Sequence, residues 1–247
     1  MAGHSKWANI RHRKGAQDAK RGKIFTKLIK EVTVAVKVGG PDPDANPRLR
    51  AAIQNARAQN MPKDKIETAI NKGSGAGADD LIETTFEGYG PDGVAIFVEC
   101  ATDNNTRTVA NVRSYFNKNN GSLGKDGCLQ FIFNHKAVFL LGKEGIDEEE
   151  LQMELIDAGA EDFEIDDEFI TVYGERTDFN TIQVKLQEMG IEPKEGGLQR
   201  VPTTSKAISE KHFSTFMKLI DTLEDDDDVQ KVYHNAEITD ALMESLG

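Results

Sequence analysis

Apolar residues recur at helical spacing through the first third of the chain. In "IFTKLIKEVTVAVKV" (24–38) they gather on one face of a predicted helix, at Phe25, Leu28, Ile29, Val32 and Val36. The stretch "NPRLRAAIQNARAQN" predicts a second helix, capped by Asn46 and opened by Pro47. A third, shorter helix is expected at about 63–72, with Gly73 past its end. Three amphipathic helices can bury a common face, so we expect a small N-terminal bundle.

From residue 81 apolar residues alternate with polar ones, which is the period of a β-strand. "LIETTFEGY" and "VAIFVECAT" flank the turn sequence "GPDG" (90–93) and predict a hairpin. A helix at about 106–119 and a strand "CLQFIF" (128–133) are expected next. The chain closes with a predicted helix at 209–224 and a strand at 229–233.

Between these elements lies a compact β-α-β-β-α-β pattern, the order found in ferredoxin-like domains. Its predicted parts are a strand at 137–142, a helix from Asp147, strands near 162–166 and 169–173, a helix "DFNTIQVKLQEMG" and a strand around 197–201.

The counts of helices and strands predict how these parts combine. The segment 81–133 lacks a second helix and a final strand, whereas 207–240 is a helix and a strand without a sheet, so we expect the two to complete one another. The fold class is therefore α+β multidomain: an N-terminal three-helix bundle followed by two α/β domains, one ferredoxin-like and inserted in the other. The predicted domains are a basic helical domain (1–79), a discontinuous α/β domain (80–134 plus 205–247) and the inserted ferredoxin-like domain (135–204). The glycine-rich "GSGAGADD" (73–80) is interpreted as a linker, since no Gly-Lys-Ser/Thr follows it.

The charge of the chain is divided unevenly. The formal net charge is −12, but residues 1–80 hold 16 Lys/Arg and 8 Asp/Glu, a net of +8, whereas residues 81–247 hold 14 and 34, a net of −20. Such asymmetry indicates a basic module that meets a polyanion, with an acidic body that does not.

Several classes of protein are disfavoured. No apolar run approaches the ~18 residues of a membrane span, and no secretory apolar region follows the first charges. The opening is basic and acid-poor like a mitochondrial transit peptide, but it lacks the usual serines, so we expect a cytoplasmic protein. Cys100 and Cys128 lie in apolar runs and are interpreted as reduced core thiols. The five histidines are scattered, which predicts no metal site and no cofactor.

The chemistry of an enzyme is not visible either. No nucleophile stands in a Gly-x-Ser-x-Gly setting and no His is followed by Glu-x-x-His. We therefore expect a non-enzymatic protein.

The strongest candidate site is the basic start of the chain. Residues 1–37 hold ten Lys/Arg against two acidic residues, and Lys20, Lys23, Lys27 and Lys30 recur at spacings of 3, 4 and 3, which aligns them along one helical stripe nearly opposite the apolar face. Arg gives bidentate contacts to phosphate, Lys gives point charges, and a Trp can stack on an unpaired base. The alternative is a solvated helix face with the Trp packed on the bundle. The predicted nucleic-acid-binding residues are Lys6, Trp7, Arg11, His12, Arg13, Lys14, Lys20, Arg21, Lys23, Lys27 and Lys30.

Other polar stretches are weaker candidates. "TDNNTRT" (102–108) follows a strand and starts a helix, so its free N–H groups beside an arginine form a candidate anion or ligand loop, although helix capping alone also explains it. That loop comprises Asp103, Asn104, Asn105, Thr106 and Arg107. The polar loop "NKNNGSLGKDG" (117–127) is explained by turn chemistry, yet such loops often carry contacts. The acidic run "EDDDD" (224–228) is interpreted as a solvated helix end that repels stray nucleic acid.

The opening "AGHSKWANIRHRKGAQDAKRGKIFTKLIKEV" closely resembles the signature of the YebC family, which includes the mitochondrial translational activator of cytochrome oxidase. The likeness continues through "NPRLRAAIQNARAQNMPKDKIETAINKG", "EGYGPDGVAIFVECATDNNTRTVANVR", "GSLGKDGCLQFIF" and "LIDTLEDDDDVQKVY". The resemblance implies a three-domain fold with an N-terminal helical bundle and two α/β domains. It also implies a regulator of gene expression: family members are described as DNA-binding transcriptional regulators, and others are similar to translation factors that act at the ribosome where consecutive prolines slow synthesis.

These observations leave three hypotheses for the function of the protein. The first is a non-enzymatic, DNA-binding transcriptional regulator, although "GGPDPDANP" (39–47) is too long for the tight turn of a helix-turn-helix pair. The second is a ribosome-associated translation factor that binds ribosomal RNA. The third is a small-molecule enzyme, which has no catalytic constellation behind it. We lead with the transcriptional regulator and expect a monomer whose partner is nucleic acid, DNA or ribosomal RNA, with the ribosome as a further partner and no membrane.

Overall fold

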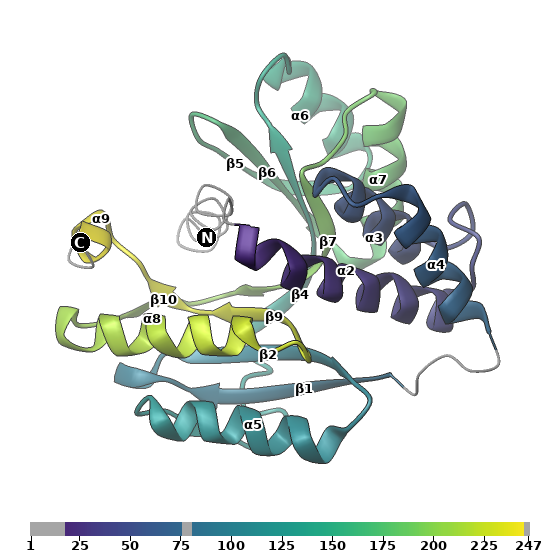
Figure 1. Ribbon diagram of the computed structural model, residues 1–247. Coiled ribbons are helices and arrows are strands. Elements are labelled where there is room, and N and C mark those ends of the chain that lie inside the picture. Colours follow the sequence, from purple (N-terminus) through teal and green to yellow (C-terminus); the bar gives the residue numbers. More distant parts are fainter. Residues whose placement is uncertain (1–17, 76–80, 245–247) are drawn as a thin grey trace. The chain divides into compact units, whose positions relative to one another are not determined.

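The computed structural model describes residues 18–75 and 81–244 (Figure 1). Its helices are α2 (Asp18–Gly39), α3 (Pro47–Ala58), α4 (Lys63–Ser74), α5 (Asn105–Lys118), α6 (Glu148–Asp157), α7 (Phe179–Glu188), α8 (Glu210–Asp225) and α9 (Asp240–Glu244), with short 3₁₀ turns η1 (Pro91–Gly93) and η2 (Arg176–Asp178). Its strands are β1 (Ile82–Tyr89), β2 (Ala95–Thr102), β3 (Ser122–Leu123), β4 (Phe133–Gly142), β5 (Ala160–Ile165), β6 (Phe169–Glu175), β7 (Glu195–Pro202), β8 (Lys206–Ala207), β9 (Val229–His234) and β10 (Ala236–Glu237). None of the helices in these ranges is long and apolar enough to cross a membrane.

Contacts within the described chain group it into two compact units. The first comprises residues 18–27, 81–134 and 200–244, and the second comprises residues 28–75 and 135–199. The discontinuous first unit joins the 81–133 segment to the C-terminal helix and strand in one sheet, as the element counts predict. The three predicted domain boundaries themselves stay a prediction.

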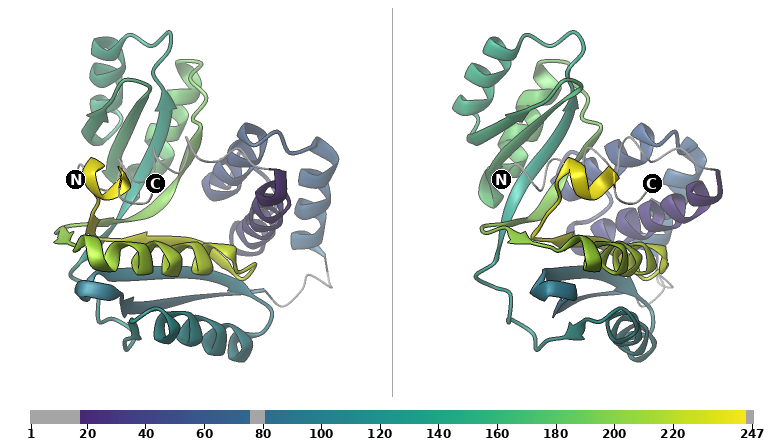
Figure 2. Two further views of the ribbon diagram at one scale, coloured as in Figure 1. Left: turned by 60° about the vertical axis from the view of Figure 1, so that its left-hand side comes forward. Right: turned by 90° about the vertical axis from the view of Figure 1, so that its left-hand side faces the viewer.

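The first unit is built on a sheet of order β3-β1-β2-β9 (Figure 2). The strands β1 and β2 form the predicted hairpin, with Ile82 opposite Thr102 and Tyr89 opposite Ala95. Helices α5 and α8 pack on one face of the sheet, where Ile96 and Val98 of β2 are fully buried. The other face of β2 packs against the segment before β4, and Phe97 contacts Phe133 edge to face with ring centroids 6.0 Å apart. Alternation along β2 thus supplies two separate cores.

The second unit contains the ferredoxin-like domain. Its sheet has the order β5-β6-β4-β7, in which the first and third strands of the β-α-β-β-α-β sequence lie at the centre. Helices α6 and α7 cover one face (Figures 1 and 2), and Phe139 of β4 stacks on Phe179 of α7 with centroids 5.2 Å apart. Fold class and connectivity therefore follow the prediction.

Helix α3 packs against this ferredoxin-like domain through apolar and polar contacts. Ala51 of α3 joins the core formed by the sheet, α6 and α7. The Asn55 side chain exchanges two hydrogen bonds with the backbone of Gly196 on β7: Nδ2 donates to the carbonyl at 2.8 Å, and Oδ1 accepts from the amide at 2.9 Å. Residues 28–75 of the helical region therefore share one unit with the ferredoxin-like domain.

Two local predictions concern the described helices α2 to α4. The predicted cap of α3 by Asn46 is confirmed, whereas the predicted position of Gly73 past the end of α4 is wrong. Asn46 caps α3 by accepting from Leu49 N at 3.0 Å, and its amide donates to the carbonyls of Ala35 and Gly40. Gly73, however, lies inside α4 and not past its end. A Cβ at Gly73 would stand 2.8 Å from the Thr33 carbonyl oxygen and 2.8 Å from Val36 Cβ, so the glycine permits the close approach of α4 to α2.

The predicted strand at 128–133 is wrong. Residues 125–132 form turns, and β4 begins only at Phe133. The buried carboxylate of Glu87 accepts hydrogen bonds from the backbone N–H groups of Gly127 and Leu129, at 3.0 and 2.5 Å, and these bonds replace a strand ladder. As a consequence Cys128 is exposed and is not a core thiol, whereas Cys100 is buried as predicted.

Candidate nucleic-acid interface

The predicted nucleic-acid-binding residues fall partly outside the described chain. Those outside are Lys6, Trp7, Arg11, His12, Arg13 and Lys14. Lys20 and Arg21 belong to α2, but their side chains are not described. The structure therefore describes three of the predicted cations, Lys23, Lys27 and Lys30, all half-buried on α2.

Two lysines of α2 contact the C-terminal end of α8. Lys23 Nζ lies 3.2 Å from Asp225 Oδ1 and donates to the Asp225 carbonyl at 3.1 Å, and Lys27 Nζ donates to the Glu224 carbonyl at 2.6 Å. The last carbonyls of a helix lack intrahelical partners and carry partial negative charge, which favours such cations. These lysines are thus engaged within the protein and are not a simple solvated face.

The two-faced pattern of α2 holds only for its first half. The five consecutive residues from Val32 to Val36 are all buried, each with 3% or less of its surface exposed. A helix buried on all sides has no polar face to present. Any phosphate-binding stripe on α2 therefore ends near Lys30.

A second basic surface, absent from the sequence-based candidates, lies on the α3–α4 pair. Only four residues, Gln59–Pro62, join the two helices. Asn60 adopts a left-handed conformation (φ 57°) and its N–H donates to the Arg57 carbonyl, while Met61 N donates to the Ala56 carbonyl. This pairing is the Schellman ending of a helix, and it makes a tight helix-turn-helix connection. The Asn60–Pro62 spacing could have indicated this turn.

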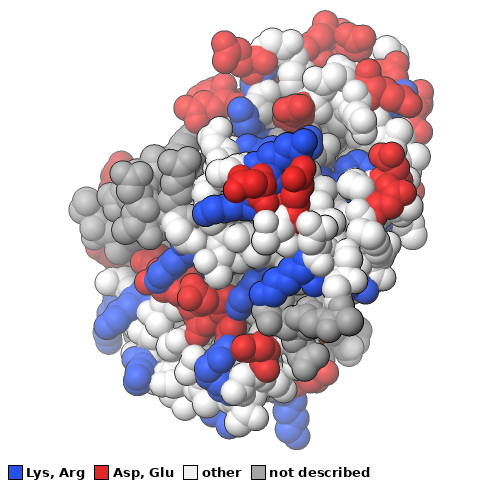
Figure 3. Space-filling view, turned by 45° about the vertical axis from the view of Figure 1, so that its right-hand side comes forward, with Lys and Arg blue, Asp and Glu red and all other residues white. Residues whose placement is uncertain are grey.

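The exposed face of α4 presents lysines at helical spacing. Lys65, Thr68 and Lys72 recur at intervals of three and four and are exposed, and Arg57 at the end of α3 is exposed as well. Lys63 forms an (i, i+4) ion pair with Glu67 at 3.4 Å. On the face drawn in Figure 3, acidic and basic side chains are interspersed. The basic surface is therefore limited to a few side chains and does not form a continuous positive face.

Two arginines of α3 are used inside the second unit. Arg48 forms an ion pair with Glu31 of α2, Nε to Oε1 at 2.9 Å. The Arg50 guanidinium donates to the side chains of Asn180 and Gln183 on α7 and to two backbone carbonyls before α3. Both residues therefore position α3 instead of facing a ligand.

The candidate anion loop is a helix cap closed by carboxylates. Asn104 Oδ1 accepts from Arg107 N at 3.0 Å, which is the N-cap contact of α5. The Arg107 guanidinium lies 2.6 Å from Asp228 Oδ2 and 2.7 Å from Asp103 Oδ1, and these hydrogen bonds, first that of Asp228, raise its pKa. Asn105 and Thr106 are exposed on the first turn. An incoming anion would meet two carboxylates here, and the anion site stays a prediction.

The acidic run 224–228 is partly structural, so its interpretation as a wholly solvated helix end is wrong. Asp228 is 5% exposed and accepts from Thr102 and Thr108 as well as Arg107. Asp226 accepts from the Tyr115 hydroxyl at 2.8 Å, and burial together with this carboxylate raises the pKa of Tyr115 to about 12. Asp225 and Asp227 are the exposed members of the run.

A cluster of Asp92, Ser209 and His212 contains the residue types of a hydrolase triad but not its geometry. Asp92 Oδ2 accepts from Ser209 N and Oγ at 2.8 and 2.7 Å, and Asp92 Oδ1 lies 2.6 Å from His212 Nδ1. In a triad the imidazole stands between the serine and the carboxylate, whereas here the carboxylate contacts both. The cluster caps the start of α8 and lowers the pKa of Asp92 to about 2, chiefly through the Ser209 hydrogen bonds.

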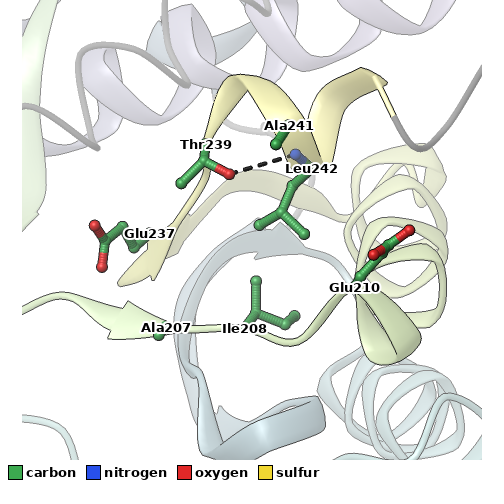
Figure 4. A pocket seen from close by; sticks show the side chains of 7 residues that line it. All are labelled: Ala207, Ile208, Glu210, Glu237, Thr239, Ala241 and Leu242. Atoms are coloured by element: carbon green, nitrogen blue, oxygen red, sulfur yellow. Dashed lines mark hydrogen bonds between the residues drawn. The ribbon is translucent and has the colours of Figure 1, made fainter.

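A pocket next to α9 is lined by small and apolar residues, a threonine and two glutamates (Figure 4). Ile208 and Leu242 form its apolar part, Glu210 and Glu237 lie at its sides, and Thr239 Oγ1 accepts from Leu242 N at 3.3 Å. Among the described residues no group of three or more His, Cys, Asp and Glu is arranged to hold a metal ion. Cys128 is exposed as a residue, but partial desolvation of its thiol and the nearby Glu87 carboxylate raise the pKa of the thiol. The raised pKa keeps this thiol protonated.

These features define a multidomain α+β protein with a helical N-terminal region and two α/β domains, one of them ferredoxin-like. Comparison with family models matches residues 5–76 to the TACO1/YebC protein N-terminal domain and residues 81–236 to the TACO1/YebC second and third domain. The chain belongs to the TACO1/YebC family.

Relatives extend over the whole chain. A protein of Clostridium botulinum (strain Okra / Type B1) is 52% identical over 96% of this chain and 97% of its own length, and one of Persephonella marina is 50% identical over all of both chains. Each is named "Probable transcriptional regulatory protein". The crystal structure of a conserved hypothetical protein from Aquifex aeolicus, Aq1575, is 38% identical, covers 95% of this chain and 98% of its own, and has a TM-score of 0.86.

Proposed function

We propose that this protein is a non-enzymatic regulator of gene expression that binds nucleic acid through its basic N-terminal part, as a DNA-binding transcriptional regulator. The charge division carries the proposal: residues 1–80 have a net charge of +8 in a chain of net charge −12. Neutralising phosphates with Lys and Arg releases counterions and supplies sequence-independent affinity. The names of its relatives support a role in transcription.

The α3–α4 connection supports DNA as the target. A helix-turn-helix unit joins two helices by a turn of three or four residues and places the second helix in a major groove. Here the turn has four residues, and the second helix, α4, carries exposed lysines. On this proposal Lys65 and Lys72 contact phosphates, in addition to the contacts predicted for the N-terminal basic residues.

A second candidate function is a translation factor bound to ribosomal RNA. The cations exposed on α4 favour it, because they are lysines, which bind phosphates as point charges and lack the rigid fork with which arginine pairs to a base edge. Recognition of backbone and shape is the usual way in which proteins bind folded RNA.

Cross-linking in cells, followed by sequencing of the attached nucleic acid, tests both functions. Enrichment of promoter DNA over ribosomal RNA supports the transcriptional regulator. Predominant ribosomal RNA overturns it in favour of the translation factor, and no recovered nucleic acid above a Lys-to-Gln variant of the N-terminal stripe overturns both.

A further inference from the structure

Phe131 is displayed on the surface of the first unit. The residue is 85% exposed, more than any other large apolar residue among those described. The apolar residues two positions away on either side, Leu129 and Phe133, are 0% and 5% exposed. In a strand all three would share one face, but the turn over 125–132 directs Phe131 outward alone.

The backbone that carries Phe131 is fixed on both sides. Before it, Glu87 holds the N–H groups of Gly127 and Leu129. After it, Thr203 N donates to the Ile132 carbonyl at 2.8 Å and Thr203 Oγ1 donates to the Phe131 carbonyl at 3.2 Å. A ring on a fixed backbone loses little conformational entropy when it binds a partner.

The surroundings of the ring are polar. Gln130 directly before it, Asn134 three positions after it, and Thr203, whose hydroxyl donates to its carbonyl, are exposed. The described part of the chain places its other exposed large apolar side chains on different elements, such as Met153 on α6. A protein partner with an apolar surface requires a contiguous patch, whereas one isolated ring among amide and hydroxyl groups suits a flat partner with polar edges.

We propose that Phe131 is a stacking platform for an unpaired nucleobase of a single-stranded or locally unpaired nucleic acid. Every base has a π-face that stacks on an aromatic ring, and its edges can bond to polar groups such as the Gln130 and Asn134 amides. The inference rests on the proposed nucleic-acid function and adds a contact outside the basic region. In the same turn Lys125 and Asp126 are both exposed and their formal charges cancel, so we expect stacking, and not net charge, to supply the affinity at this platform.

The test compares Phe131→Ala, Phe131→Tyr and the matched control Met153→Ala in the full chain. The probes are an unstructured RNA of about 16 nucleotides, the single-stranded DNA of the same sequence, and that DNA annealed to its complement. Loss of one stacked base is expected to raise the Kd of Phe131→Ala for a single strand about 5- to 150-fold, with an unchanged slope of log K against log salt. Phe131→Tyr and Met153→Ala are expected to bind like the wild type, and the duplex to be insensitive to all three.

A spectroscopic readout reports stacking directly. In a Trp7→Phe, Phe131→Trp double variant the single tryptophan is expected to be quenched on binding a single strand. The relative effect on the RNA and DNA strands shows which nucleic acid the platform serves. An equal Kd for Phe131→Ala and the wild type overturns the stacking platform alone. So does the absence of quenching at strand concentrations where anisotropy shows that the double variant is bound. Failure of the wild type to bind any of the three probes overturns both the platform and the proposed function.

Discussion

Lys23 of α2 and Asp225, the last residue of α8, form an ion pair with 3.2 Å between Nζ and Oδ1. The pair joins residues 202 positions apart and brings a predicted phosphate-binding lysine to a carboxylate of the protein itself. The acidic end of α8 therefore occupies part of the predicted phosphate-binding stripe. On the proposed function, nucleic acid that binds at this stripe has to displace the internal carboxylate.

Removing that competition should strengthen nucleic-acid binding. We expect an Asp225→Asn, Asp227→Asn variant to bind a DNA or RNA probe about twofold to fivefold more tightly at low salt, which corresponds to the free energy of an exposed ion pair. Fluorescence anisotropy measures the Kd. Glu149→Gln, Glu150→Gln on α6 makes the same charge change at two exposed carboxylates and is the control. Equal Kd values for the two variants would show that general repulsion, and not the ion pair, is at work.

The lysines of α4 should contribute phosphate contacts. Lys65→Gln, Lys72→Gln is expected to weaken binding and to lower the slope of log K against log salt by about two units on duplex DNA, at ~0.9 per contact. Lys211→Gln, Lys218→Gln is the matched control, because these exposed lysines of α8 have the same spacing and lie outside the basic region. A salt titration of both variants distinguishes them, and identical slopes would remove α4 from the interface.

Gly73 should behave unlike an ordinary helical glycine. Alanine normally stabilises a helix interior by about 1 kcal/mol relative to glycine. At Gly73 the new Cβ would press on the Thr33 carbonyl oxygen and on Val36, so we expect Gly73→Ala to lower the free energy of unfolding by about 1–3 kcal/mol. Gly22→Ala on α2, where a Cβ meets nothing within 4 Å, should raise it by about 0.5–1 kcal/mol. Urea denaturation measures both, and a stabilising Gly73→Ala would contradict the close packing of α2 and α4.

The Asp92 cap should make stability depend on acid pH. Its pKa is lowered from 3.8 to about 2, so its ionised form is favoured in the folded protein. The resulting stabilisation is present in full above about pH 4 and is lost as the pH falls through about 2. Asp92→Asn keeps a residue type that tolerates the left-handed backbone (φ 57°) while removing the charge. Thermal unfolding between pH 2 and 7 should therefore show a smaller drop of Tm at low pH for the variant, and parallel curves would exclude the cap as the cause.

Local patterns predicted the parts of the fold that depend on local chemistry. Asn46 before Pro47 identifies the start of α3, and the strand and helix periods of 137–201 identify the ferredoxin-like order, because each signal is complete within a few residues. The strand at 128–133 failed for the opposite reason. Leu129, Phe131 and Phe133 alternate like a strand, but Glu87, about 40 residues earlier, fixes their backbone as a turn.

The sequence was sufficient to predict which charged residues make up the candidate site. It was not sufficient to predict which other residues of the chain these side chains contact. A helical wheel places Lys23 and Lys27 opposite the apolar face of α2, yet it cannot show that the end of α8 approaches them. The same is true of Arg107, whose sequence neighbours explain the cap, while its charge is neutralised largely by Asp228 from the other end of the chain. Phe131 was not singled out because its exposure depends on a tertiary anchor.

The two hydrogen bonds between Asn55 and Gly196 have a consequence for how copies of this protein meet in a crowded solution. β7 is an outer strand of its sheet, and the Asn55 amide bonds to its backbone where the strand of a neighbouring molecule would otherwise pair. The opposite outer strand, β5, exposes Glu161, which pairs with Lys136, and Asp162, whose carboxylate repels that of an identical strand. At one edge strand, β7, the Asn55 amide thus occupies backbone hydrogen-bonding groups, and at the other, β5, a carboxylate repels a second copy. Both features disfavour the growth of intermolecular sheets and fibrils.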